Sequence, residues 1–304
     1  MVAAAPLPQE HAQPQAQDLG LALPFLKTTG GKGRLLEELG KHVPERFGRY
    51  HELFVGGGAL FFALGRKLGR PSPAVLCDDS ELVVAAWIGV RDHCDYVLGY
   101  LEHHVRAHTA SSEQHYYKSR ASLPSVTDPA KRAALILYLN HVCYNGVMRV
   151  NRAGAFNVPL GSYKNPRIYD EKNLRACSWA LQGVEIEHGD FESRAAKVGR
   201  GDFVYFDPPY VPVKKAGGAE PGARKTSSTT RYTAVGFTMD DQRRLRDAAL
   251  GCKARGAHVL LSNSDTPEVR ELYADGFELR AIQARRSVNR SAAGRGPVSE
   301  LLIW

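Results

Sequence analysis

Four adjacent residues place a carboxylate, two prolines and an aromatic ring at the end of an apolar run: Asp207, Pro208, Pro209 and Tyr210. A simple turn does not need this set, because Asn-Gly or Pro-Asp-Gly would serve. The exocyclic amine of a nucleobase is a weak nucleophile, and a carboxylate with a nearby carbonyl oxygen can localise its lone pair by accepting both of its hydrogens. Two prolines stiffen such a loop, and the ring can stack on the base. The set therefore indicates chemistry at a nucleobase amine; the alternative is a strand-ending turn with its tyrosine in the core.

A second candidate site is the glycine turn at residues 56–58, which lies between an apolar run and an apolar helical stretch. Such a turn lets the backbone approach a ligand, and the helix that follows can receive an anion. Asp78 stands 20 residues beyond the last of these glycines, where a carboxylate accepts hydrogen bonds from ribose hydroxyls. A cap for the next helix is the alternative role of Asp78. In the dinucleotide-binding motif GxGxxG, a third glycine would stand where this chain has Phe61. The turn therefore suits a mononucleoside ligand better than a dinucleotide.

The elements around these motifs predict an α/β fold. A strand at 50–55, a helix at 59–68 and a strand at 73–77 form a βαβ unit, which predicts a parallel, doubly wound sheet. We also expect a first helix over 31–43 and a later one over 239–255. Further strands are predicted at 184–187, 203–206 and 257–262, with a closing antiparallel pair at 277–283 and 298–304.

Between about residues 81 and 181 strand signals almost vanish, which predicts an inserted helical subdomain. Inside it, Arg-Ala-Gly separates two short extended pieces over 148–159, as in a hairpin. We therefore expect a disordered tail at 1–23, a catalytic domain formed by 24–90 and 176–304, and a recognition insertion at 91–175. The small, polar and basic run 214–230 predicts a mobile loop after Tyr210.

Composition narrows the class of protein. Net charge +8 and a pI near 9.2 favour a polyanionic partner. The five scattered cysteines show neither a disulfide framework nor metal-ligand spacing, so no metal is expected. No apolar run reaches the roughly 18 residues that a membrane span needs. The N-terminal segment lacks the features of a signal peptide. We expect a soluble, cytoplasmic protein.

Together these motifs resemble the Dam-type (D12 class, alpha group) adenine-specific DNA methyltransferases, which use S-adenosyl-L-methionine. The resemblance runs from residue 24 onward, about nine tenths of the chain, with PFLKTTGGK, FVGGG, LCDDSEL, HGDF, DPPY and VLLSNSD in the family's order. It implies a doubly wound, Rossmann-like methyltransferase sheet with an inserted, mainly helical DNA-recognition subdomain that carries a β-hairpin. The product would be S-adenosyl-L-homocysteine.

The resemblance also implies roles in cofactor binding. Lys32 would lie near the methionine carboxylate, Asp190 near the cofactor's adenine, and Asp207 would serve both cofactor and base. Thr28 and the next threonine stand where the family usually has Trp-Ala. The full cofactor set is Thr28, Lys32, Phe54, Gly56, Gly58, Asp78, Asp190 and Asp207.

Residues 138–166 resemble the family's target-recognition hairpin. The resemblance makes Tyr144 a stacking or intercalating residue, with Asn145 and Arg149 reading bases. A charged loop that is merely solvated is the alternative. The expected partner is double-stranded DNA, with GATC or a related site as the target. The enzyme would be a monomer or weak dimer, either solitary or paired with a restriction endonuclease. The DNA-binding set is Tyr144, Asn145, Arg149, Arg152, Asn157 and Lys164.

Other reactions fit less well. Methylation of adenine in RNA or of glutamine in protein uses a similar nitrogen, but Asp207, where many of those enzymes carry asparagine, favours the DNA base. Methylation of cytosine carbon 5 needs a Pro-Cys nucleophile, and none of the five cysteines follows a proline. A non-catalytic DNA-binding protein would have no need of an intact glycine turn, Asp78 and DPPY.

Overall fold

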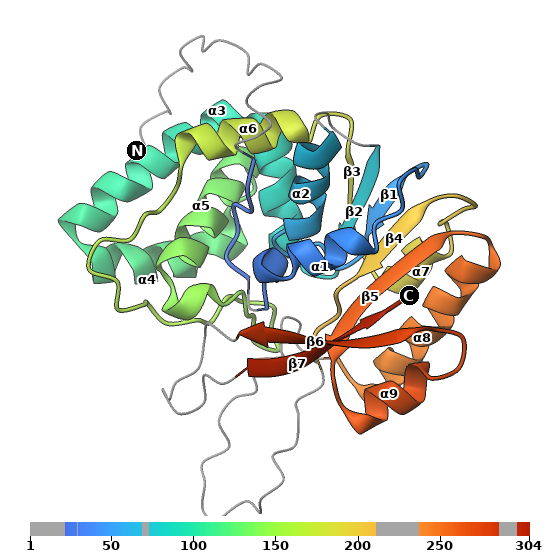
Figure 1. The fold of residues 1–304 in the computed structure, drawn as a ribbon. Helices are drawn as coiled ribbons and strands as arrows, with labels where there is room; N and C mark the ends of the chain where they lie inside the picture. The colour runs from blue at the N-terminus through green and yellow to red at the C-terminus, as the bar shows by residue number, and fades with distance from the viewer. Residues whose placement is uncertain (1–21, 29, 69–72, 211–236, 286–296) are drawn as a thin grey trace, which may run out of the picture.

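The computed structural model describes residues 22–28, 30–68, 73–210, 237–285 and 297–304 (Figure 1). The predicted loop at 214–230 and the predicted tail up to residue 21 lie outside the described residues. Ala22, inside the expected tail, is already buried in the core. No described helix combines the length and the apolar character that crossing a bilayer requires.

Within the described residues, seven strands form one sheet in the order β3-β2-β1-β4-β5-β7-β6. The first five strands along the chain are parallel, and β7 pairs antiparallel with both β5 and β6. The expected closing antiparallel pair is confirmed, although its second strand inserts between β5 and β6. The strands are β1 Tyr50–Glu52, β2 Ala74–Asp78, β3 Glu185–His188, β4 Phe203–Phe206, β5 His258–Ser264, β6 Leu279–Arg285 and β7 Pro297–Ile303.

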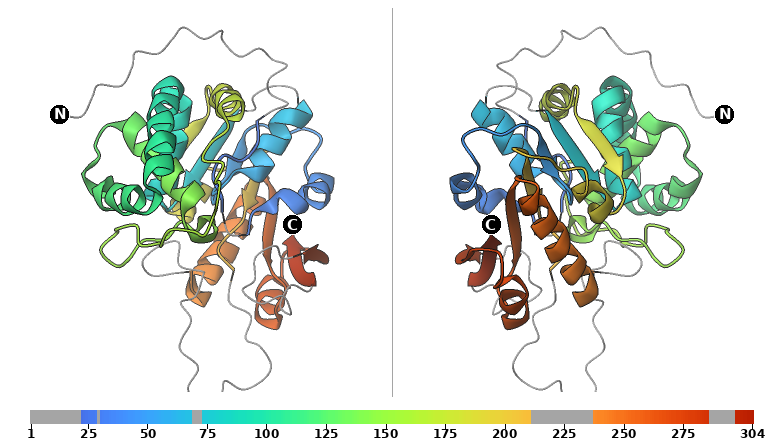
Figure 2. Two further views of the ribbon diagram at one scale, coloured as in Figure 1. Left: turned by 90° about the vertical axis from the view of Figure 1, so that its left-hand side faces the viewer. Right: turned by 90° about the vertical axis from the view of Figure 1, so that its right-hand side faces the viewer.

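Helices cover both faces of the sheet, which gives three layers (Figures 1 and 2). Side chains alternate along β4, so that Phe203 and Tyr205 enter one core and Val204 and Phe206 the other. The first face carries α1 Leu36–Lys41, α2 Ala59–Leu68, α3 Glu81–Ala110 and α6 Glu171–Ala180; the second carries α7 Phe191–Ala195, α8 Met239–Ala254 and α9 Pro267–Tyr273.

A helical layer extends from the first face, as the sequence predicts. It contains the outer part of α3 with α4 Ser112–Ser122 and α5 Pro129–Val142. The helices α3 and α5 cross closely, because a Cβ atom at Gly89 would lie 2.2 Å from that of Ala133. At His93 the backbone of α3 leaves the helical region (φ −135°, ψ 31°), close to the expected start of the insertion.

Two expected elements are shorter than their sequence patterns. The helix predicted over 31–43 is a 3-10 turn at Lys32–Arg34 followed by α1. The strand predicted over 50–55 ends at Glu52, since the chain bends there into the glycine turn. Within the hairpin predicted at 148–159, one isolated antiparallel bridge joins Val150 with Phe156, and a second, Cys143 with Leu160, lies just outside these bounds.

Candidate active site

The glycine turn and the DPPY segment meet at the centre of the sheet. They follow β1 and β4, which are neighbours in the sheet. The next strand after β1 is β2, on one side of this pair, whereas the next strand after β4 is β5, on the other side. Asp78 ends β2, and Asp190 follows β3 at the same edge. Ligands of doubly wound sheets bind at this kind of switch point, beyond the carboxyl ends of the strands. Segments far apart in the sequence therefore share one edge.

The carboxylate of Asp207 is fixed through one of its two oxygens. Oδ1 lies 2.7 Å from the Lys32 ammonium and accepts a hydrogen bond of 2.9 Å from the Ser262 hydroxyl. The Ser262 Oγ atom is in turn 2.9 Å from the Tyr205 hydroxyl, inside the sheet. Among the described residues, the hydrogen bonds of this carboxylate go to Oδ1, so Oδ2 is available to an incoming group. Asp207 is 20% exposed, whereas Lys32 is only 6% exposed.

Lys32 lies beside the DPPY segment. Its ammonium donates to the carbonyl of Gly30 at 2.9 Å and stands 4.7 Å from the centre of the Tyr210 ring. A buried ammonium requires such partners, because desolvating an unpaired charge is costly. The helix predicted from residue 31 begins with a 3-10 turn at this lysine.

Tyr210 is half-buried at the end of DPPY rather than packed in the core. Its hydroxyl donates a 2.7 Å hydrogen bond to Oε2 of Glu300 on β7. Burial, together with the nearby carboxylates of Asp207 and Glu300, raises the pKa of the Tyr210 hydroxyl, which therefore remains a donor. No sequence motif pointed to Glu300; it reaches Tyr210 because β7 pairs directly with β5.

Asp78 supports the glycine turn. Its Oδ2 atom accepts the backbone N–H of Gly56 and its Oδ1 atom that of Ser80, both at 2.9 Å. The N-cap of α3 is Ser80, whose hydroxyl accepts from Val83 N. The capping role considered for Asp78 therefore belongs to Ser80. Burial raises the pKa of Asp78 to about 6, although both backbone hydrogen bonds favour the carboxylate.

Glycine is required at the end of this turn. Gly58 has φ +64°, and a Cβ atom there would lie 2.4 Å from the Trp87 indole. That indole also donates to the carbonyl of Gly56, at 2.9 Å. The turn therefore lies between the indole and Thr28. A Cβ atom added at Gly57 would be 3.2 Å from the hydroxyl oxygen of Thr28.

A carboxyl group missed by the sequence reasoning lies under the turn. Glu52 is 3% exposed and accepts hydrogen bonds from the Tyr50 hydroxyl at 2.8 Å and from Phe61 N at 3.2 Å. Burial chiefly raises its pKa, to about 8, with a further contribution from the charge of Asp207. Burial thus favours the protonated form of Glu52 beside the carboxylates of Asp78 and Asp207.

Beyond Asp78 the edge of the sheet is lined by aromatic rings and by Asp190. Phe54 packs against Phe191 and Phe237, with ring centres 5.2 and 5.8 Å away. The Asp190 carboxylate caps α7 by accepting from Glu192 N at 2.9 Å, and it lies 2.9 Å from the Arg244 guanidinium. An aromatic cluster beside a carboxylate suits a purine ring with its exocyclic amine.

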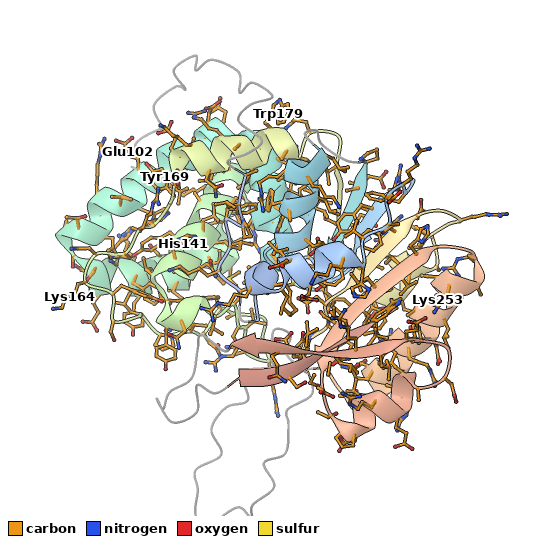
Figure 3. All side chains as sticks on the ribbon, viewed as in Figure 1. Glu102, His141, Lys164, Tyr169, Trp179 and Lys253 are labelled. Carbon is orange, nitrogen blue, oxygen red and sulfur yellow. The ribbon has the colours of Figure 1, made fainter. Side chains whose placement is uncertain are left out.

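The candidate DNA-binding residues surround the end of α5. Tyr144 is 44% exposed, and Asn145 has a left-handed backbone with φ 54°. Arg149 donates through Nε to the Asn157 side chain at 2.8 Å across the hairpin, so these two act as one unit. Arg152 is exposed at the hairpin tip, while Lys164 lies at the outer edge of the helical layer (Figure 3).

These groups match the parts of S-adenosyl-L-methionine. Lys32 can face its carboxylate, Asp78 its ribose hydroxyls, and Phe54 its adenine, while the glycine turn leaves space for the backbone approach. The described residues contain no group of three or more His, Cys, Asp or Glu side chains placed to hold a metal ion.

Comparison with known proteins identifies the family. The D12 class N6 adenine-specific DNA methyltransferase family matches residues 29–288. A Type II methyltransferase, M1.LlaDCHI of Lactococcus lactis subsp. cremoris, is 36% identical over 287 residues, 92% of this chain and 94% of that protein. M.MjaIII of Methanocaldococcus jannaschii is also 36% identical, over 92% of this chain and 98% of its own length. The DNA adenine methylase of Escherichia coli K12 is 33% identical over 91% of this chain and 93% of its own.

These matches decide among the reactions that the sequence left open, in favour of adenine in DNA over adenine in RNA or glutamine in protein. The chain belongs to the D12 class N6 adenine-specific DNA methyltransferases, which places it among the enzymes that methylate adenine N6 in DNA with S-adenosyl-L-methionine as the methyl donor.

Proposed function

We propose that the enzyme methylates an adenine rotated out of the duplex and held by Asp207, Pro208 and Tyr210. The supporting observation is the fixed carboxylate: Lys32 and Ser262 both bind Oδ1 of Asp207, and none of the described residues occupies Oδ2. In a duplex the adenine amine is paired and stacked, so no carboxylate can reach both of its hydrogens. Base flipping, which costs a few kcal/mol, is therefore part of the proposal.

The DPPY segment activates the amine in this mechanism. Oδ2 of Asp207 and the carbonyl oxygen of Pro208 accept the two N6 hydrogens, and the lone pair becomes localised on nitrogen. Pro209 stiffens the loop, and the Tyr210 ring stacks on the base while Glu300 holds its hydroxyl. When bound, S-adenosyl-L-methionine supplies an electrophilic methyl carbon on its sulfonium sulfur. The extra proton on the methylated nitrogen leaves to Asp207 or to water.

The cofactor pocket is proposed to use Lys32 for the carboxylate, Asp78 for the ribose and the turn at Gly56 and Gly58 for close backbone approach. Thr28 flanks that turn. Phe54 and Asp190 take the adenine end, with Asp207 between cofactor and base.

An Asp78→Ala variant should bind S-adenosyl-L-homocysteine roughly tenfold more weakly or worse, the scale of a charge-assisted pair of hydrogen bonds to a ribose. Because the pKa of Asp78 is raised to about 6, wild-type affinity should also fall as the pH drops through that value and the carboxylate takes up a proton. Calorimetry across this pH range measures both effects.

The matched control is Asp79→Ala, which removes the adjacent exposed carboxylate. It should leave the affinity within about twofold of wild type. Equal effects of the two variants, or an unchanged affinity for Asp78→Ala, would return Asp78 to a purely structural role.

For DNA, we propose that the recognition subdomain within residues 91–175 reads the target through the hairpin. Tyr144 fills the vacated stack, Asn145 and the paired Arg149 and Asn157 contact bases, and Arg152 with Lys164 binds phosphates. The proposed target is GATC or a related site. Single-molecule methylation mapping of DNA from an expressing host identifies the target directly.

A fluorescent 2-aminopurine at the target position should brighten when the protein and a cofactor analogue bind, because it leaves the base stack. The Tyr210 ring should quench part of this signal, so Tyr210→Ala should brighten it further. Tyr96→Ala, which removes an exposed ring on α3, serves as the control and should match wild type. Fluorescence that stays at the duplex level in both wild type and Tyr210→Ala rules out flipping.

We further propose that the enzyme acts as a monomer or weak dimer, which light scattering with and without DNA tests. A restriction endonuclease of the same target specificity is the proposed partner if the enzyme is not solitary. Cleavage of unmethylated but not methylated target DNA by a nuclease from the same host would establish that pairing.

A further inference from the structure

The segment Pro24–Thr28, here called the strap, is fastened to the end of α5 by one buried side chain. Asn140 is 0% exposed, and its carboxamide oxygen accepts the backbone N–H of Lys27 at 2.8 Å. Its amide nitrogen donates to the carbonyl of Lys27 at 2.9 Å and to that of Gly146 at 3.0 Å. Both N–H groups of the carboxamide are therefore used, one on the strap and one on the turn after α5.

The next residue adds further contacts to the strap. A ring nitrogen of His141 lies 2.9 Å from the carbonyl oxygen of Phe25, and the other is 3.0 Å from that of Arg167 (Figure 3). The Lys27 ammonium donates to the backbone carbonyl of His141 at 2.9 Å. The strap is thus docked along α5 through its backbone as well as through one side chain.

The strap also touches the recognition turn, defined as Tyr144–Gly146. Gly146 has φ +63°, and a Cβ atom there would lie 2.5 Å from the Cβ atom of Lys27. Only a glycine permits this approach. The backbone that presents Tyr144 and Asn145 therefore rests directly on the strap, and Asn140 hydrogen-bonds both.

At its other end the strap reaches the cofactor pocket. The hydroxyl oxygen of Thr28 is 3.2 Å from the Cβ position of Gly57, within the glycine turn. Four residues after Thr28, the Lys32 ammonium lies 2.7 Å from Asp207. One short piece of chain therefore contacts both the recognition turn and the glycine turn.

We propose that Asn140 is a positioning residue that couples cofactor binding to target recognition. A bound cofactor fixes the strap through Thr28, and the strap, through Asn140, fixes the recognition turn. A buried carboxamide is stable only when its hydrogen bonds are all made, so strap and turn move together. Bound cofactor should therefore increase the affinity for DNA. By thermodynamic linkage, bound DNA must increase the affinity for cofactor by the same factor. The inference rests on the proposed roles of the two ends.

The coupling is measured as the ratio of two dissociation constants for S-adenosyl-L-homocysteine, without DNA and with a saturating duplex that carries the mapped target. In the wild-type enzyme the ratio should be at least about fivefold. Asn140→Asp is nearly isosteric and keeps the acceptor for Lys27 N, but it loses both donated hydrogen bonds. Its ratio should fall close to one, while cofactor and DNA each still bind alone.

The chain offers a matched control. Asn173 on α6 binds the backbone of Leu23 in the same manner: its carboxamide oxygen accepts the Leu23 N–H at 2.8 Å, and its amide nitrogen donates to the Leu23 carbonyl at 3.1 Å. The described contacts of Asn173 do not include the recognition turn. Asn173→Asp should keep the wild-type ratio. If Asn140→Asp retains the wild-type ratio, or if both variants lower it equally, the proposal is wrong.

A second measurement needs no variant and so does not depend on how well Asn140→Asp folds. Hydrogen exchange of wild-type enzyme should show slower exchange at the Lys27 amide when DNA alone is bound, and at residues 144–147 when S-adenosyl-L-homocysteine alone is bound. If both ligands bind but neither remote protection occurs, the coupling is absent. Failure of DNA or of S-adenosyl-L-homocysteine to bind at all would instead overturn the proposed function.

Discussion

An Asp207→Ala variant should transfer methyl groups at least about 100-fold more slowly than wild type, because the lost carboxylate orients the substrate amine. It should still fold, although less stably, because the Lys32 ammonium loses its charged partner but keeps the carbonyl of Gly30. Single-turnover transfer of a labelled methyl group into the target duplex measures the rate. Circular dichroism and the thermal midpoint report the fold. A variant that keeps more than about a tenth of the wild-type rate would contradict the role of Asp207.

Two further variants test whether the loss of methyl transfer is specific to the Asp207 carboxylate. Ser262→Ala removes one of the two groups that hold Oδ1 of Asp207, and it should slow transfer by about tenfold, the scale of one hydrogen bond to a charged group. Asp202 lies at the opposite end of β4 and accepts from Arg49 N at 3.0 Å and Gly199 N at 2.9 Å. Asp202→Ala should destabilise the protein by about 1–3 kcal/mol without changing the rate of the folded fraction.

A Gly58→Ala variant should be less stable by about 2–4 kcal/mol and should bind S-adenosyl-L-homocysteine at least roughly tenfold more weakly. The added methyl group would lie 2.4 Å from the Trp87 indole, and the left-handed backbone at this position strains any residue with a Cβ atom. Relief of either conflict moves the glycine turn away from Asp78. Urea unfolding measures the free energy, and calorimetry measures the affinity.

Gly65→Ala is the control for this change. Gly65 lies in α2, seven residues after Gly58, and an added Cβ atom would meet nothing within 4 Å. Alanine is the better helix former by about 1 kcal/mol, so this variant should be as stable as wild type or more so. A Gly58→Ala protein that matched Gly65→Ala in stability and affinity would show that the turn tolerates a side chain.

Local sequence patterns predicted the elements that carry the motifs. The helix at 59–68 and the strand at 203–206 have the predicted bounds, because glycines and DPPY mark their ends sharply. The helical insertion followed from the loss of strand signals. Parallel strands bring their carboxyl ends to one edge, which is why Gly56, Asp78 and Asp207 could be expected to meet.

The residues that the sequence did not reveal act through distant partners. Ser262, Glu300 and Asn140 meet their partners from other elements, and no spacing along the chain encodes those contacts. The short helices α7 and α9, of 5 and 7 residues, are too brief to show a helical period. The prediction of one continuous first helix was wrong at its start, where Lys32–Arg34 form a 3-10 turn and Lys32 pairs with Asp207.

The insertion of β7 between β5 and β6 bears on how the active site is assembled during folding. The strand β6 precedes β7 in the chain, yet it reaches the sheet only through β7. The strand β6 can therefore join the sheet only together with β7 or after it, once β7 has docked onto the edge of β5. Glu300 lies on β7, so the Tyr210 hydroxyl acquires its partner only when β7 docks. Folding intermediates with a complete cofactor edge would thus lack an ordered base-stacking tyrosine, and refolding should restore cofactor binding before it restores methylation.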